Sequence, residues 1–252
     1  MARPVVLNIP HSSRHIPLEW RARILLDDAG LSLGLLRMTD LHTERLFDVG
    51  GAARAVFPVS RLIVDPGRFA DDSLEPMAER GMGVIYTRTS GGLLLRHEPG
   101  SGDRGALLDG FYQPHHRNLA ALAGVTLAAN GSCLIVDCHS FPSLALPYER
   151  QPEGAPRPEI CIGTDSFHTP DSLRSGLMEF FLSRGYRVAE NDPFAGSLVP
   201  MEFYGTEPRV QPVMIEIRRD LYMDEESGSQ LPSFMRVRGD ISEAISGAAS
   251  RQ

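Results

Sequence analysis

Apolar residues follow two patterns along the chain, and together they predict alternating strands and helices. Short continuous runs at Val5–Ile9, Cys133–Asp137 and Val213–Ile217 are typical of central strands covered on both faces. Apolar positions at helical spacing predict a helix over Leu33–Val49, which ends at two glycines. Further elements of both kinds are expected: strands at Ala55–Val59, Leu62–Val64, Val84–Thr87, Leu93–Leu95, Glu159–Ile162 and Tyr186–Ala189, and helices at Gly105–Asn130 (bent at Pro114), Leu173–Ser183 and Phe234–Ile245.

This alternation predicts an α/β fold with a sheet between two layers of helices, the three-layer αβα class. The chain shows no internal repeat, no low-complexity run and no linker-like change of composition. We therefore expect one domain over residues 1–252. The segment Gly100–Gly105 matches G-x-G-x-x-G, but no predicted strand directly precedes it and no acid lies between Asp109 and Asp137. A dinucleotide site needs both, so we interpret this segment as a flexible loop.

The amino-acid composition excludes several classes of function for this protein. The 252 residues are 42% apolar and 23% charged, as in an ordinary globular protein, and the formal net charge of −7 disfavours a general nucleic-acid binder. The chain has no lysine, so all 25 cationic residues are arginines. Chemistry that needs a lysine, such as a Schiff base or a P-loop, is therefore excluded.

The spacing of the cysteines and the length of the apolar segments indicate the cellular compartment of the protein. Cys133, Cys138 and Cys161 form no C-x-x-C pair, which favours a reducing compartment and argues against a structural zinc site built from cysteines. The first apolar run is too short for a signal peptide, and no window reaches the length of about 18 residues that a membrane span needs. We expect a cytoplasmic protein with neither a membrane nor a nucleic acid as partner.

Polar residues stand at the ends of the predicted central strands. His11 follows the first strand, His139 follows Cys133–Asp137, and Glu216 lies within Val213–Ile217. Ligands of open α/β sheets bind at the carboxyl ends of strands, so these side chains are expected at one edge. A catalytic zinc takes about three nitrogen or oxygen ligands, and the third is Asp40 or Glu44, four residues apart on the predicted helix.

Each candidate also has a purely structural interpretation. His11 and His139 could be hydrogen-bonded loop residues, and Asp40 and Glu44 could form a solvated helix face. Asp137 could cap a helix, or it could orient the ring of His139.

Glu216 and two arginines have similar alternatives. A glutamate in an apolar strand needs a partner such as Arg218 or Arg61, or it is a general base with a raised pKa. Arg61 and Arg68 flank one turn, where guanidinium groups can grip a carboxylate in bidentate fashion. Both could instead be ion-paired surface residues.

A series of short motifs, in order and spacing, resembles the N-formylglutamate amidohydrolases, the deformylases of histidine breakdown. The resemblance runs from about Val5 to Glu225. The motifs are Pro10-His11-Ser12 with Ile16-Pro17, Thr39–His42, Ser60-Arg61 with Asp65–Arg68, Tyr112–His116, Asp137–Ser140, Asn191–Gly196, Tyr204-Gly205, and Glu216 with Leu221–Met223.

This resemblance implies a fold similar to the zinc carboxypeptidases, with a mixed central sheet in the phosphorylase/hydrolase-like arrangement. It implies one divalent metal, zinc, held by His11, Asp40 and His139. It further implies that Glu216 is the general base for a metal-activated water and that Arg61 stabilises the oxyanion.

The implied substrate is a small carboxylate-bearing amide such as N-formyl-L-glutamate, cleaved to formate and the amino acid. Arg68, His116 and Asn191 are the implied substrate-binding residues. Gly67 and residues 195–202 differ from the family pattern, so another N-acyl amino acid or a small peptide is an alternative substrate. Two other classes stay open: a metal-free serine hydrolase that uses Ser12 or Ser140, and a non-catalytic small-molecule-binding protein. The oligomeric state is left open.

Overall fold

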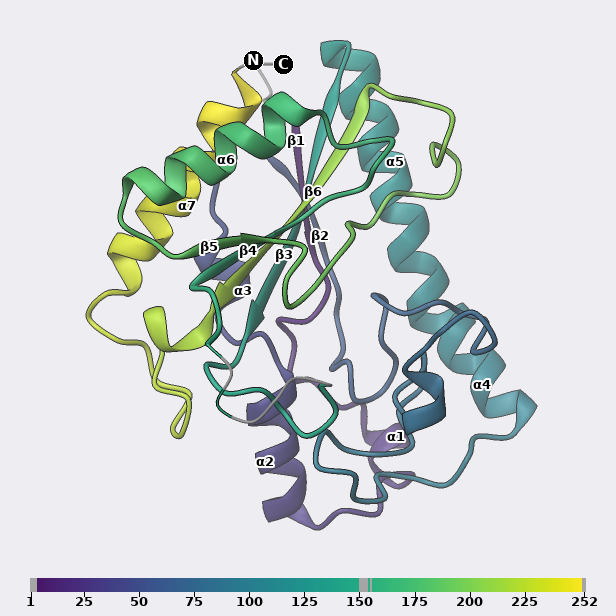
Figure 1. Ribbon diagram of the computed structural model, residues 1–252. Coiled ribbons are helices and arrows are strands. Elements are labelled where there is room, and N and C mark those ends of the chain that lie inside the picture. The colour runs from purple at the N-terminus through teal and green to yellow at the C-terminus, as the bar shows by residue number, and fades with distance from the viewer. Residues whose placement is uncertain (1–3, 150–153, 155, 251–252) are drawn as a thin grey trace.

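The computed structural model describes residues 4–149, 154 and 156–250, and its centre is a six-stranded sheet (Figure 1). Its strands lie in the order β2-β1-β3-β6-β4-β5. Their bounds are β1 Val5–Ile9, β2 Ala53–Val56, β3 Cys133–Phe141, β4 Ile160–Gly163, β5 Val188–Glu190 and β6 Val210–Arg218. The first four strands in this order are parallel, whereas β4 runs antiparallel to β6. The sheet is therefore mixed, as expected.

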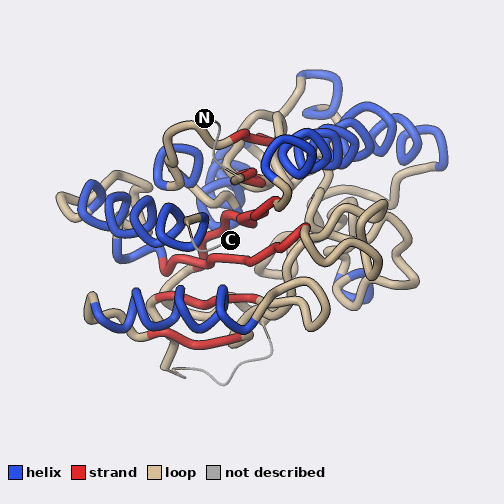
Figure 2. Tube along the Cα trace, turned by 90° about the horizontal axis from the view of Figure 1, so that it is seen from above, coloured by secondary structure: helices blue, strands red, loops and turns tan. Residues whose placement is uncertain are grey.

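Helices cover both faces of this sheet, which confirms the three-layer fold class. Helix α5 packs on one face, while α3, α6 and α7 pack on the other, and Figures 1 and 2 show α5 and α7 on opposite sides of the strands. The helices are α1 Leu18–Arg21, α2 Asp28–Met38, α3 Thr43–Leu46, α4 Ser101–Leu107, α5 Gln113–Asn130, α6 Asp171–Ser183 and α7 Phe234–Ala249.

Strand β3 shows how the sheet brings polar groups to one place. Successive side chains of a strand point to opposite faces. Leu134 and Val136 pack with α6 and α7, whereas Ile135 packs with α5. The next residues on the α5 face are Asp137 and His139, because the strand continues to Phe141 instead of ending at Asp137 as predicted. The carboxyl-terminal part of this face is thus polar but still buried.

The predicted helix over Leu33–Val49 is wrong, because two helices occupy this region. Helix α2 ends at Met38, and α3 begins only at Thr43. Between them the backbone N–H of Asp40 donates to the His11 carbonyl at 2.9 Å, and His42 adopts a left-handed φ of 67°. The apolar periodicity continues across the break although α2 packs into one core with Leu31, Leu35 and Met38 and α3 packs into another with Leu46.

The predicted strand at Leu62–Val64 is also wrong. These residues are buried, but they form a turn outside the sheet, and the Arg96 guanidinium donates to the carbonyls of Leu62 and Ile63. The predicted small strands after residue 80 reduce to isolated bridges, Met82 with Tyr86 and Arg88 with Leu94. Burial without strand pairing accounts for the apolar runs at Leu62–Val64 and 84–86, whereas Leu93 and Leu94 are exposed.

The glycine motif at 100–105 is the start of α4 and not a flexible loop. No strand directly precedes it, so the strand that a dinucleotide site needs is missing at this place. The long predicted helix Gly105–Asn130 is divided by a π-helical segment, Leu108–Tyr112, directly before α5. Pro114, which has no N–H to donate, lies in the first turn of α5 and accounts for the change of register.

The other predicted elements are present with shifted ends; for example, β2 starts two residues before Ala55. Two short 3-10 helices lie at Ala78–Arg80 and Arg219–Leu221.

All three cysteines are free and buried. Among the described residues, no helix combines the length and apolarity that crossing a membrane requires.

Candidate active site

The structure brings His11, Asp40 and His139 together at the carboxyl edge of the sheet. His11 follows β1, His139 lies in β3, and Asp40 lies in the break between α2 and α3. The two Nδ1 atoms are 3.2 Å apart, and Asp40 Oδ2 lies 3.3 Å from His139 Nδ1 and 3.6 Å from His11 Nδ1. All three side chains are buried.

These three atoms fit a single metal ion. Zinc bonds to nitrogen and oxygen are about 2.0–2.1 Å long, so ligand atoms of a tetrahedral site lie about 3.3 Å from one another. Two imidazole nitrogens and a carboxylate oxygen are also ligand types that zinc accepts. Glu44 is exposed on α3, so Asp40 is the acid that the structure places in this cluster.

The outer nitrogen of each imidazole faces a carboxylate. His11 Nε2 lies 2.7 Å from Asp65 Oδ1, and His139 Nε2 lies 3.1 Å from Asp137 Oδ1. An ionised carboxylate only accepts, so each Nε2 carries a hydrogen, and each Nδ1, once free of hydrogen, would present a lone pair to a metal ion in the cluster. Asp137 thus takes the orienting position considered from the sequence. Asp65 was not recognised as a site residue, although it directly follows a buried apolar run, as Asp137 does.

Asp40 is held from its other side by Arg219. The Arg219 Nη2 donates to Asp40 Oδ1 at 2.9 Å, and the backbone N–H of Ser140 donates to Oδ2 at 3.2 Å. Burial by itself raises the pKa of Asp40, but hydrogen bonds from His11 and His139 and the charge of Arg219 bring it well below its usual value. Asp40 is therefore an anion in this site.

Glu216 lies on β6 directly opposite His139 on β3. It is buried, and its Oε2 has no hydrogen-bond partner among the described residues. Burial raises the pKa of Glu216 to about 7, with the charge of His139 opposing the shift and that of Asp40 adding to it. The pairing considered with Arg218 is absent, since that guanidinium binds Asp220. A carboxylate with a pKa near neutrality can both take and return a proton.

These residues open onto a cavity of about 1040 Å³. Its lining includes His11, Asp40, Arg61, Arg68, His116, His139 and Glu216. Asn191 is not part of the lining. Its amide oxygen accepts from the N–H groups of Thr164 and Gly196, so it holds the loop that contributes Phe194 to the cavity wall.

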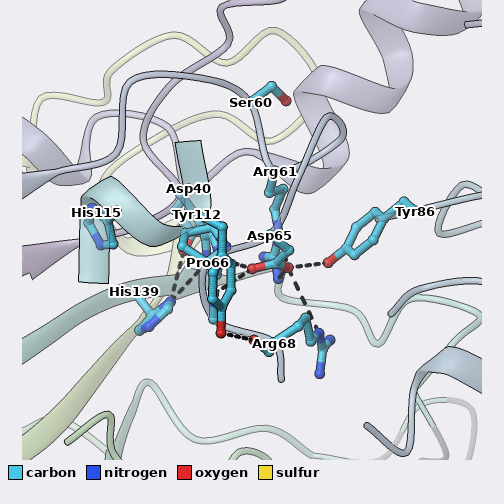
Figure 3. A network of polar contacts seen from close by, with 12 residues as sticks. Asp40, Ser60, Arg61, Asp65, Pro66, Arg68, Tyr86, Tyr112, His115 and His139 are labelled. Atoms are coloured by element: carbon cyan, nitrogen blue, oxygen red, sulfur yellow. Dashed lines mark hydrogen bonds and ion pairs between the residues drawn. The ribbon is translucent and has the colours of Figure 1, made fainter. Parts of the chain in front are cut away.

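The two arginines at the turn are partly committed to carboxylates. Arg61 donates through Nε and Nη2 to Asp65 Oδ2, at 3.1 and 2.7 Å. Arg68 donates through Nη1 to Glu75 at 3.3 Å. Its buried Nε lies 3.8 Å from Asp65 Oδ2, an ion pair (Figure 3), and makes no hydrogen bond with a described residue. Both arginines are thus ion-paired, as in the structural alternative, but they lie beside the cavity.

Neither candidate serine has the partner that a serine nucleophile needs. The Ser140 hydroxyl lies 3.3 Å from Arg219 Nε, and the buried Ser12 hydroxyl has no hydrogen-bond partner among the described residues. The imidazole nitrogens nearby bind carboxylates or face the cluster. The geometry therefore disfavours a serine–histidine dyad.

The fold and the site define a class: a three-layer α/β protein with a buried cluster of histidines and carboxylates at the carboxyl edge of its sheet. The family follows from the sequence comparison, in which the family model described as N-formylglutamate amidohydrolase matches residues 3–223. The chain belongs to this family, whose members are hydrolases acting on amide bonds, as the motifs predicted.

Two solved structures share the fold. The N-formylglutamate amidohydrolase from Ralstonia eutropha JMP134 is 21% identical with a TM-score of 0.85, covering 99% of this chain and 94% of its own. A gene product from Agrobacterium tumefaciens is 19% identical with a TM-score of 0.70, covering 99% and 91%. No curated protein sequence matches the chain significantly.

Proposed function

We propose that this protein is a zinc-dependent amidohydrolase that releases formate, or another acid, from an N-formyl or N-acyl amino acid, with N-formyl-L-glutamate as the first substrate to test. One observation carries the proposal. His11 Nδ1, His139 Nδ1 and Asp40 Oδ2 converge beside Glu216, whose Oε2 has no hydrogen-bond partner among the described residues, in a cavity large enough for a small molecule.

The charge balance supports a cation in this cluster. Among the described residues, the carboxylates around it outnumber the guanidinium groups paired with them by one: Asp40, Asp65, Asp137 and Glu216 against Arg61, Arg68 and Arg219. Buried charge needs compensation, and a metal cation supplies it. Held by the two histidines and Asp40, the ion would act as a Lewis acid that makes a bound water more acidic.

Glu216 is the proposed general base. It takes a proton from the water that attacks the amide carbon, and it delivers that proton to the nitrogen of the leaving amine as the C–N bond breaks. Arg61 is the proposed donor to the oxyanion. Its Nη1 is the guanidinium nitrogen that remains for this, because Nε and Nη2 are bound to Asp65.

Arg68 is the proposed partner of the substrate carboxylate, supported by its place in the cavity wall and by its Nε, which makes no hydrogen bond with a described residue and lies 3.8 Å from Asp65 Oδ2. His116 contributes to the same wall, held by a contact of 3.0 Å between its Nε2 and the Pro66 carbonyl. Asn191 acts on substrate through the loop that it holds. The cavity volume lies at the upper end of the range of about 300–1,000 Å³ for small-molecule sites, so larger N-acyl amino acids or small peptides are the second candidates.

The first experiment measures metal content of the purified protein by elemental mass spectrometry, followed by formate release from N-formyl-L-glutamate and a panel of N-acyl amino acids. We expect one zinc per chain and hydrolysis that a chelator abolishes. A protein that takes up no metal even after zinc loading would contradict the proposal.

Two histidine variants sharpen this test. His139→Ala is expected to lose zinc on dialysis, because it removes one of the converging nitrogens. His168→Ala is the matched control. His168 is also buried, but its Nδ1 binds the Val210 carbonyl and its Nε2 accepts from Gly205 N–H, away from the cavity. Equal zinc retention by both variants would remove His139 from the ligand set.

A further inference from the structure

We propose that Asp65 is a positioning residue that holds the His11 ring ready to bind metal through Nδ1, and that Arg61 and Tyr86 hold Asp65 in turn. This inference rests on the proposed function, since it concerns a metal ligand. It assigns to Asp65 and Tyr86 a role that the motifs did not indicate. It also gives Arg61 a second task besides the oxyanion.

The carboxylate of Asp65 is fully buried, and both of its oxygens are occupied (Figure 3). Oδ1 accepts from His11 Nε2 at 2.7 Å and from the backbone N–H of Gly67 at 2.8 Å. Oδ2 accepts twice from Arg61 and once from the Tyr86 hydroxyl. Donors therefore approach the carboxylate from every side, and its orientation is fixed.

The Asp65 carboxylate is surrounded by donors: two Arg61 nitrogens, the Tyr86 hydroxyl and the Gly67 N–H. Among the described residues no acceptor is placed for a hydrogen on this carboxylate, so Asp65 accepts from His11 and selects the His11 tautomer with hydrogen on Nε2. The opposite tautomer would place a hydrogen on Nδ1, where it would block a metal and leave Asp65 Oδ1 facing a bare nitrogen.

Asp137, the carboxylate that binds His139, is held by fewer side chains than Asp65. Asp137 accepts from His139 at 3.1 Å and from the Asn8 amide at 2.8 Å, and among the described residues no arginine binds it. Asp65 differs because two further side chains fix it, and neither comes from the sheet. The N–H of Asp65 donates to the Val84 carbonyl at 2.8 Å, which ties the turn to the segment that carries Tyr86.

The test compares zinc affinity of the full-length protein variants by competition with a chromophoric chelator. Asp65→Asn is expected to bind zinc about 10–100-fold more weakly, because the amide cannot accept from His11 and Arg61 as the carboxylate does. Tyr86→Phe removes a single donor to Asp65 and is expected to weaken binding by a smaller factor. Both variants should also alter the visible spectrum of the cobalt-substituted protein, which reports ligand geometry.

Asp240→Asn is the matched control. Asp240 is also a buried carboxylate that accepts from a tyrosine, Tyr186, at 2.7 Å and from an arginine, Arg184, at 2.8 Å, but it lies on α7. We expect its loss to lower stability and to leave zinc affinity and the cobalt spectrum unchanged.

Three outcomes are separable. A folded Asp65→Asn variant with wild-type zinc affinity and cobalt spectrum overturns the inference. If that variant does not fold, Tyr86→Phe decides, and wild-type affinity and spectrum in this variant overturn the inference as well. Failure of the wild-type protein to bind zinc overturns the proposed function instead.

Discussion

At the scale of residues, the three cluster residues and Glu216 are buried polar groups that satisfy one another, except for one carboxylate oxygen. A buried polar atom without a partner costs free energy, so such an atom is rare in a native protein. His11, Asp40 and His139 each have partners on both sides, whereas Oε2 of Glu216 has none among the described residues. This exception lies opposite His139 and lines the cavity, as expected for a group that contacts a substrate or water.

Replacement of Glu216 by glutamine tests its role as base. The amide keeps the size of the side chain but cannot accept and return a proton. We expect kcat to fall by about 10²–10⁴-fold while zinc content stays at the wild-type level. Steady-state kinetics and elemental analysis of the same preparation measure both. Wild-type turnover by Glu216→Gln would show that another group is the base.

The same residue predicts a pH dependence of the metal-free protein. Folding raises the pKa of Glu216 from its usual value near 4.5 to about 7, so between these values the native state binds more protons than the unfolded state. Stability from this group is therefore present below about pH 4.5 and is lost as pH rises through 7, by on the order of 3 kcal/mol.

Urea unfolding of chelator-treated wild type and Glu216→Gln at several pH values measures this effect. The wild type should lose stability relative to the variant as pH rises. Parallel pH profiles of the two proteins would contradict the shifted pKa.

At the scale of elements, the break between α2 and α3 decides the metal cluster. A continuous helix over Leu33–Val49 would place Asp40 and Glu44 on one face. The break instead places Asp40 against His11, with Glu44 exposed. Helix α2 positions this break, and its first turn is fixed by Asp27, whose side chain accepts from the Gly30 N–H at 2.8 Å.

Removal of this cap is expected to destabilise the protein modestly. Asp27→Ala leaves the Gly30 N–H without its partner and should lower the free energy of unfolding by about 1 kcal/mol. Asp27→Asn keeps an accepting oxygen and should stay close to wild type. Urea denaturation of the three proteins measures the difference, and an alanine variant as stable as the asparagine variant would show that the cap contributes nothing.

At the scale of the whole molecule, the cavity lies where separate parts of the chain meet. The sheet supplies His139 and Glu216, the loop segment that follows β2 supplies Arg61 and Arg68, and α5 supplies His116. A ligand that binds all of them only in the folded state must also stabilise that state.

Zinc is therefore expected to raise the melting temperature of the chelator-treated protein. At a free concentration a thousand times its Kd, a ligand adds about 4 kcal/mol to the free energy of unfolding. Scanning calorimetry with and without zinc measures the shift, and His139→Ala should show little of it. An equal shift in both proteins would place zinc elsewhere on the chain.

The apolar pattern along the chain predicts the sheet-edge part of the site. Continuous apolar runs mark β1, β3 and β6, and the carboxyl ends of parallel strands lie at one edge, so local pattern and topology together predicted that His11, His139 and Glu216 are neighbours. The motifs also predicted the family. The substrate contacts of Arg61 and Arg68 stay predictions, because the structure shows the cavity but no ligand.

Only the tertiary structure decided which other groups complete the site. It selected Asp40 over Glu44, assigned Arg219 to Asp40, and brought Asp65 and Tyr86 to His11. These contacts join segments far apart in sequence, and their hydrogen bonds leave no periodic pattern along the chain. Packing around buried charges, and not local propensity, orients each side chain there, and this is the physical reason that the sequence alone could not predict it.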